Sequence, residues 1–237
     1  MKRLHCAAFL LVLQLALSLR ALAGDPARVE LYVTPYYDSN GPVIKVGQYS
    51  SGLASRNAGD FVETIRQMRK HWNELNFMEL YVAAIQLYDR GYRNEATYWF
   101  YTAQYRGRQF ALLVDPQKMG GLGDRGFELY HAQEAFFTLA GPTINGFAFG
   151  NIELLSTIVR RVASENRTVP NVNRIYPGVT FIGSSQWPRV NAQLNAGLGK
   201  LATQLGEQKT EIERQRSENG TQARFGHLTS TPFPNGY

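Results

Sequence analysis

The feature that most constrains the fold of this chain is the helical spacing of its apolar residues. Beyond Asp60, apolar side chains recur every three or four residues through most of the sequence, which places them on one face of an α-helix. Turn-forming residues such as Asp89-Arg-Gly91 interrupt the spacing and divide it into several helices. We expect helices over 60–75, 77–87, 94–107, 127–139, 151–164 and 190–216. The sequence therefore predicts a mainly α (α+β) fold of antiparallel helical hairpins, with Asp60 as the first N-cap.

A different pattern precedes these helices. Between Val29 and Thr34, apolar residues occupy every second position, which is typical of a β-strand. Asp38-Ser-Asn-Gly41 supplies turn residues, and Val43–Tyr49 has the composition of a second strand. A two-stranded hairpin is marginal by itself, so we expect this small N-terminal β-hairpin to pack on the helices, with a loop over 50–59 after it.

Glycine and proline divide the second half of the chain. Glycines between 120 and 126 predict a long loop, and the helix over 127–139 is expected to end before Gly141-Pro142 because proline disrupts a helix interior. The stretch 168–188 is rich in both residues and is expected to be irregular, with a short strand over 179–182. The longest amphipathic run, 190–216, follows it.

The first 23 residues have the pattern of a secretory signal peptide. Lys2 and Arg3 form a positive n-region, an apolar stretch follows, and Ala21-Leu-Ala23 fits the small-x-small cleavage rule. We therefore expect a signal peptide over 1–23, a helical domain with the β-hairpin over 24–186, an amphipathic C-terminal helix packed on that domain over 187–218, and a loose tail over 219–237. The expected location is the bacterial periplasm.

Removal of this segment excludes several classes of protein. The only cysteine, Cys6, is lost, so a disulfide scaffold, a zinc ribbon or a thiol nucleophile is excluded in the mature chain. The formal net charge falls from +6 to +3, because Lys2, Arg3 and Arg20 leave with it. That small surplus argues against a nucleic-acid partner. No later apolar segment is long enough for stable membrane insertion as a spanning helix.

The stretch Leu87–Gly107 reads LYDRGYRNEATYWFYTAQYRG. Small Ala96 and Ala103 would let two antiparallel helices approach closely, with Trp99 filling the space between them. Residues 71–107 in this way resemble a Sel1-like or tetratricopeptide (TPR)-like helical hairpin, although the sequence has no convincing second copy. The alternative is a single hairpin inside a larger helical domain.

Aromatic and basic residues on the same helix are the candidate binding site. If Ala96, Trp99 and Ala103 face inward, three tyrosines and two arginines lie on another side, a composition enriched in protein–protein interfaces. These candidate partner-binding residues are Tyr98, Tyr101, Tyr105, Arg106 and Arg108. The alternative is that the tyrosines pack inside the fold, because aromatic residues at helical spacing often belong to the core.

The sequence offers no convincing catalytic or metal-binding motif. The glycine cluster at 119–126 lacks the Gly-Lys-Ser/Thr ending of a phosphate-binding loop, and no Gly-x-Ser-x-Gly elbow occurs. Glu128 and His131 form a single Glu-x-x-His element, whereas a di-metal site needs two, and His71 with Glu74 has the reverse order. We therefore expect a protein that is not an enzyme and that uses no metal and no cofactor.

The combination of signal peptide, TPR-like hairpin and polar tail resembles periplasmic immunity proteins that neutralise secreted antibacterial effectors, including lipase effectors of type VI secretion. That resemblance implies a protein partner, a secreted effector toxin that is blocked by steric occlusion of its active site. Two alternatives stay open. One is an envelope assembly or scaffold adaptor that uses the C-terminal helix, and the other is a cell-wall hydrolase that uses carboxylates.

Overall fold

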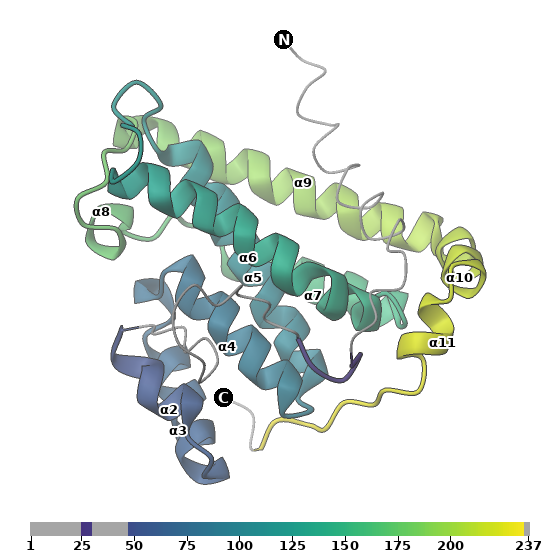
Figure 1. Ribbon diagram of the computed structural model, residues 1–237. Coiled ribbons are helices and arrows are strands. Elements are labelled where there is room, and N and C mark those ends of the chain that lie inside the picture. The colour runs from purple at the N-terminus through teal and green to yellow at the C-terminus, as the bar shows by residue number, and fades with distance from the viewer. Residues whose placement is uncertain (1–24, 30–46, 235–237) are drawn as a thin grey trace.

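The computed structural model of the chain describes residues 25–29 and 47–234. The predicted mainly helical class is confirmed, and the described residues contain no β-strand (Figure 1). Most of the predicted β-hairpin, like the signal peptide, lies outside the described residues. The last part of its second strand was predicted wrongly, because Gly47–Tyr49 forms a 3-10 helix (η1) that leads directly into α2.

The first helices replace a predicted loop. α2 spans Ser50–Ala54 and α3 spans Ala58–Lys70. The N-cap of α3 is Asn57 and not Asp60, because the Asn57 side chain accepts hydrogen bonds from the backbone N–H groups of Gly59 and Asp60. Such a cap satisfies donors that have no partner inside the helix. The apolar face of α3 is buried against the rest of the chain, as its spacing predicts.

The predicted helical hairpin is present as α4 and α5. A short 3-10 helix, η2 (Trp72–Glu74), leads into α4, which spans Phe77–Asp89 and starts with a capping box of Asn76 and Glu79. α5 spans Arg93–Leu113, longer than predicted, and contacts α4, α6, α7 and α9. Ala96, Trp99 and Ala103 are fully buried. α5 is therefore the central helix, and it has almost no solvent-exposed side.

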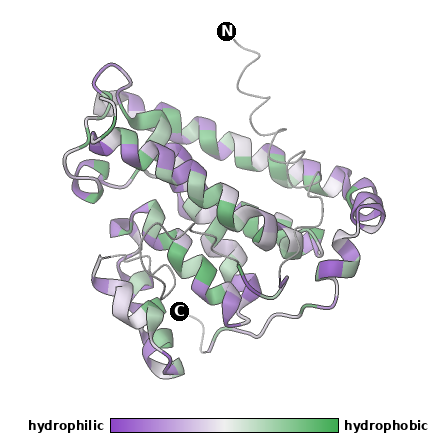
Figure 2. Cartoon of the chain, in the orientation of Figure 1, coloured by the Kyte–Doolittle hydropathy of each residue, from purple (hydrophilic) through white to green (hydrophobic). Residues whose placement is uncertain are grey.

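Helix α6 continues where the sequence predicted an end. It spans Arg125–Ala148 and carries Pro142 in its interior. A proline there removes one backbone hydrogen bond, but burial of Ala140, Ile144 and Ala148 compensates through packing. In Figure 2 the polar loop before α6 contrasts with the apolar turns along the helix itself.

The last third of the chain wraps around the central hairpin. α7 spans Ile152–Glu165 with Asn151 as its N-cap, and α8 spans Val172–Ile175. The predicted strand over 179–182 is reduced to a single antiparallel bridge between Val114 and Phe181. After η3 (Ser184–Gln186), α9 spans Trp187–Glu207 and packs on α7 and α5, while α10 (Lys209–Glu218) is separated from it at Gln208. The long amphipathic run is therefore two helices.

The segment predicted as a loose tail is attached to the fold. It begins with α11 (Thr221–Phe225) and then returns to the α4–α5 turn, visible as the yellow chain in Figure 1. The Thr231 N–H donates to the Gly91 carbonyl oxygen (2.9 Å), and the Phe233 and Tyr92 rings lie edge to face at 5.3 Å. The sequence prediction failed here because the contacts that hold this segment come from residues far away in the sequence.

The same turn also holds the N-terminal described segment. The Val29 N–H donates to Asp89 Oδ1 (2.8 Å), and the Tyr88 hydroxyl donates to the Pro26 carbonyl oxygen (2.9 Å).

Among the described helices, none combines the length and the apolar composition that a bilayer crossing requires.

Candidate functional site

The structure places the predicted partner-binding residues inside the molecule. Tyr98, Tyr101, Tyr105 and Arg106 are exposed by 4% or less, and Arg108 is half-buried. Tyr98, Tyr101, Tyr105 and Arg106 therefore do not form an accessible surface, and the alternative of core packing describes the three tyrosines. The reason is that α5 is surrounded by other helices, so the side opposite Ala96 and Ala103 also faces protein.

Tyr98 belongs to a charged cluster that joins α3, α5 and α7. Its hydroxyl donates to Glu165 Oε2 (2.6 Å), while Arg161 Nε donates to Glu165 Oε1 (2.8 Å). Arg69 Nη1 donates to the Tyr98 hydroxyl (2.7 Å), and Arg69 also pairs with Glu165. Trp72 stacks on Tyr98 with ring centroids 5.6 Å apart. All of these polar groups partner one another, so the cluster has a structural role.

The electrostatics of this cluster favour an ionised Glu165. Burial by itself would raise the pKa of Glu165, but hydrogen bonds from Tyr98, Arg161 and Arg69 outweigh burial and lower the pKa to about 2. Burial raises the pKa of Tyr98, and its hydrogen bond to Glu165 raises it further. Tyr98 therefore keeps its proton and acts as the donor in this pair.

Tyr105 belongs to a second buried network, which reaches α9. Its hydroxyl donates to Asn191 Oδ1 (2.7 Å), and Gln109 Nε2 donates to the same oxygen (2.7 Å). The Asn191 amide in turn donates to the carbonyl oxygens of Asn166 (3.1 Å) and Arg167 (2.7 Å). Both donors and the acceptor of the Asn191 side chain are thus satisfied, which fixes α9 against the segment that follows α7.

Arg106 also contacts the segment that follows α7, through Asn166. Its Nη1 donates to the Trp72 (2.6 Å) and Leu75 (3.2 Å) carbonyl oxygens, and its Nε donates to Asn166 Oδ1 (3.3 Å). Burial lowers the pKa of this guanidinium to about 10, so it stays charged at neutral pH. A buried arginine satisfied mainly by carbonyl oxygens orders the chain around it, and here it joins the η2 segment to Asn166 at the end of α7.

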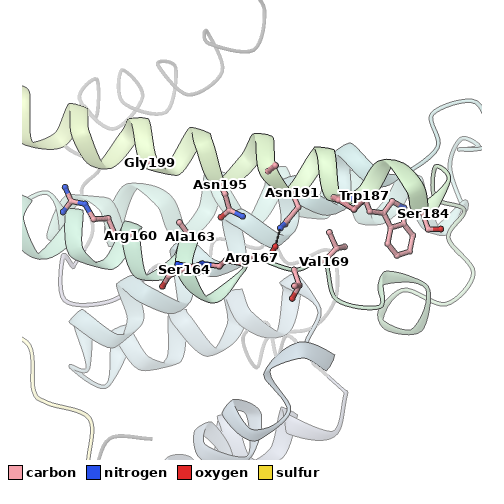
Figure 3. A pocket seen from close by; sticks show the side chains of 13 residues that line it. Arg160, Ala163, Ser164, Arg167, Val169, Ser184, Trp187, Asn191, Asn195 and Gly199 are labelled. Atoms are coloured by element: carbon pink, nitrogen blue, oxygen red, sulfur yellow. Dashed lines mark hydrogen bonds between the residues drawn. The ribbon is translucent and has the colours of Figure 1, made fainter.

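Next to these networks, and lined in part by Asn191, the structure has a pocket of about 620 Å³, which we call the α7–α9 groove (Figure 3). Its volume lies within the range of pockets that hold small ligands or short peptide segments. Its walls come from the end of α7, the chain after it, and the first half of α9. The lining residues are Arg160, Ala163, Ser164, Arg167, Thr168, Val169, Ser184, Trp187, Pro188, Asn191, Ala192, Asn195 and Gly199.

The groove exists because both helices present small residues to each other at this end. On α7 these are Ala163 and Ser164, and on α9 they are Ala192 and Gly199. The helices run antiparallel, since Ser156 Oγ donates to the Ala202 carbonyl oxygen (3.0 Å) whereas Asn191 bonds the chain just after α7. Small side chains on both walls leave an open channel between the two helices.

The charge on the groove is positive. Arg160 and Arg167 line it, and none of its lining residues is acidic. Both arginines are exposed and have no ion-pair partner among residues 25–29 and 47–234. By contrast, neighbouring Arg161 is held by Glu165. The two lining arginines are therefore available to an anionic group.

Two further side chains give the groove polarity and a rigid end. Asn195 Nδ2 donates to the Asn166 carbonyl oxygen (3.1 Å), whereas the buried Asn195 Oδ1 has no hydrogen-bond partner in the described part of the chain. Trp187 forms one end wall and is fixed by its indole N–H, which donates to the Ile182 carbonyl oxygen (2.9 Å). Buried polar atoms without a partner are uncommon and often mark a place where a ligand or water binds.

These residues were not predicted from the sequence, where the aromatic and basic residues of α5 are the more conspicuous candidates. A signal was present in the apolar run of α9, where Asn191 and Asn195 lie one turn apart beside the buried Val190, Leu194 and Leu198. An asparagine in the apolar face of a helix must find hydrogen-bond partners, so two in succession indicate a polar site.

The remaining candidate motifs lie apart from the groove. Glu128 Oε1 accepts a hydrogen bond from the Gly123 N–H (3.1 Å), and Glu74 pairs with Arg174 Nη2 (2.8 Å). Within the described ranges no group of three or more histidine, cysteine or acidic side chains is placed to hold a metal ion. The glycine loop before α6 exposes Leu122, which is 91% exposed, and none of the loop residues lines the groove.

Comparison with known proteins adds one relative. The chain is 24% identical over 221 residues to an uncharacterized protein of Haemophilus influenzae, an alignment that covers 86% of this chain and 81% of that protein. No protein-family model matches the sequence, and no solved structure matches it.

Proposed function

We propose that this protein is an exported inhibitor, an immunity protein that neutralises a secreted toxin by binding it and blocking its active site, without catalysis of its own. The observation that carries this proposal is the α7–α9 groove. It offers two arginines without ion-pair partners in the described residues and one buried amide oxygen without a donor, on a framework fixed by the Tyr105 and Arg106 networks. A rigid site with unsatisfied polar groups favours binding of a complementary partner.

The adaptor alternative has less support. An adaptor built on the C-terminal helix needs an apolar stripe that is free for a partner. The stripe of α9 is buried against α7 and α5, with Leu194, Leu198 and Leu205 each exposed by 5% or less. The groove beside α9 is a better candidate for partner contact than the apolar stripe of α9.

The experiment is affinity capture. The full chain carries a tag after Tyr237 and is produced in cells that also make secreted toxins, and the proteins bound to it are recovered from the envelope fraction. We expect one stoichiometric protein partner with hydrolase character, whose toxicity in the envelope is relieved by co-expression of this chain. A matched variant that lacks residues 2–23 should stay in the cytoplasm and give no protection. Protection by that variant, or capture of structural envelope proteins alone, would overturn the proposal.

A further inference from the structure

The α7–α9 groove has a shape and a charge that specify the chemistry of its occupant. We infer that it binds a short, extended, acidic segment of a partner protein, with carboxylates of the segment on Arg160 and Arg167. This inference rests on the proposed function, in that it takes the occupant to be part of a protein. It goes further by naming the chemical class of the segment and the two residues that recognise it.

Charge complementarity is the first argument. The groove carries two guanidinium groups and no carboxylate among its lining residues, and the nearest glutamate of α7, Glu165, is already bound by Arg69, Arg161 and Tyr98. Nothing in the described residues of the groove therefore competes for Arg160 or Arg167. Guanidinium groups bind carboxylates in a planar, two-point geometry that favours such a partner over a neutral one.

The position of the arginines is the second argument. Because α7 and α9 are antiparallel, Arg160 lies toward the Gly199 end of the groove, and Arg167 lies toward the Asn191 end. From Trp187 to Gly199 the wall formed by α9 rises through twelve helical steps, about 18 Å at 1.5 Å per residue. An extended segment of about five residues has that length. A segment with an acidic residue toward each end can reach both arginines.

The floor of the groove is the third argument. Ala163 and Ala192 add apolar lining that suits a small or aliphatic side chain between the two carboxylates. An extended peptide brings backbone N–H donors that a fatty acid or a simple anion lacks, and one of them reaches the buried Asn195 Oδ1 once the Asn195 side chain turns toward the groove. Trp187 closes one end, so the segment lies along α9 and does not cross it.

The test uses the full chain and a library of random seven-residue peptides displayed on phage. The groove variant is Arg160→Glu with Arg167→Glu. The matched control is Arg189→Glu with Lys200→Glu, which makes the same change of charge on exposed residues of α9 that do not line the groove. Circular dichroism checks the fold of both, and Arg160→Gln with Arg167→Gln replaces the groove variant if the charge reversal prevents folding.

We expect the selected peptides to carry two or more Asp or Glu residues with an apolar residue between them. Their affinity for the groove variant should fall by on the order of 10- to 100-fold, with little change for the control. Selected peptides without acidic residues, an absence of selection, or equal binding to both variants would overturn the inference. A change of sedimentation only in the groove variant would show a second copy of the chain as the occupant and would also overturn it.

This experiment separates the two proposals. If acidic peptides bind the groove but affinity capture finds no toxin, the inference stands and the inhibitor function fails. If a toxin is captured and binds the groove variant as tightly as the control, the inhibitor function stands and the inference fails.

Discussion

The hydroxyl of Tyr105 on α5 donates a hydrogen bond to Asn191 Oδ1 on α9, at 2.7 Å, across 86 positions of sequence. Asn191 in turn lines the α7–α9 groove, so a residue of the central helix sets the position of a residue in the candidate site. The same asparagine accepts from Gln109 and donates to the chain after α7. One side chain therefore joins the core of the molecule to the floor of its groove.

Replacement of Asn191 by alanine tests this arrangement. The change removes the bonds that Asn191 makes to the Tyr105 hydroxyl, the Gln109 amide and the Arg167 carbonyl oxygen. The Asn166 carbonyl oxygen keeps its bonds from Asn195 (3.1 Å) and from the Tyr105 hydroxyl (3.2 Å). We expect the free energy of unfolding to fall by about 2–4 kcal/mol, because buried polar groups without a partner cost about 1–3 kcal/mol each and some recover a partner by small shifts. Urea denaturation measures the change. Gln193→Ala, at an exposed position of the same helix, should change stability by less than about 0.5 kcal/mol.

Glu165→Gln tests the charged cluster. The pKa of Glu165 is lowered to about 2 in the folded chain, so its ionised form stabilises the fold above the unfolded pKa. This contribution is complete near neutral pH and is lost as the pH falls from about 5 toward 2. We expect the variant to be less stable than the natural chain by about 2 kcal/mol at pH 7 and to approach it in stability at pH 3.

The measurement for Glu165 is the free energy of unfolding at intervals between pH 7 and pH 3. Glu207→Gln is the control, since Glu207 is an exposed carboxylate at the end of α9. A constant difference between Glu165→Gln and the natural chain across this range would show that the cluster acts by packing and not by charge.

Asp89→Asn tests the opposite dependence on pH. Burial raises the pKa of Asp89 to about 6, so the fold binds this proton more tightly than the unfolded chain does. The associated stability is present at low pH and is lost as the pH rises from about 4 through about 6. Asparagine keeps an acceptor for the Val29 N–H and removes the buried charge. We expect the variant to be more stable than the natural chain by on the order of 2 kcal/mol at pH 8, and equal to it near pH 4.

Thermal unfolding of the Asp89 variant between pH 4 and pH 8 checks this expectation, with Glu207→Gln again as the control. Hydrogen exchange of the Val29 amide follows the same contact directly. If the natural chain and the variant lose stability in parallel across this range, Asp89 does not titrate in the way its burial requires.

Gly146→Ala tests the docking of α11. An alanine in the interior of a helix is normally more stable than glycine by about 1 kcal/mol. At position 146 the added Cβ would come within 2.5 Å of the Phe225 ring, so the ring and α11 must move. We expect the free energy of unfolding to fall by about 1–3 kcal/mol and the amides after Gly220 to exchange faster.

Gly206→Ala is the matched control for α11, because nothing lies within 4 Å of the position of its added Cβ. It should leave stability unchanged or raise it by up to about 1 kcal/mol. Equal gains in both variants would mean that α11 does not pack on α6 through Phe225.

The sequence predicted well those helices whose apolar residues repeat along one face only. α3, α7 and most of α9 present one apolar face to the core, and the spacing of Ile65, Leu155 or Leu194 shows it directly. The hairpin of α4 and α5 followed from Ala96, Trp99 and Ala103. Spacing of this kind is a local property, so it can be read without knowledge of the fold.

The candidate site was hidden for the converse reason. α5 has almost no solvent-exposed side, so its polar residues Tyr105 and Arg106 look like surface residues until α9 and the turn after α7 are in place. The groove needs small residues from two helices that lie about 30 positions apart. Pairing of that kind depends on how α7 and α9 are brought together, and local spacing does not contain it.

The α4–α5 turn contacts both residues 25–29, through Val29, and the chain after α11, through Thr231. These two segments are therefore neighbours in space. A circular permutant is therefore accessible: a short linker could join residue 234 to residue 25, with new ends opened at Leu122 in the exposed glycine loop. Neither the linker nor the new chain ends fall on a residue that lines the groove. Such a rewired chain would keep the binding surface while it frees both ends for sensors or for attachment to a support.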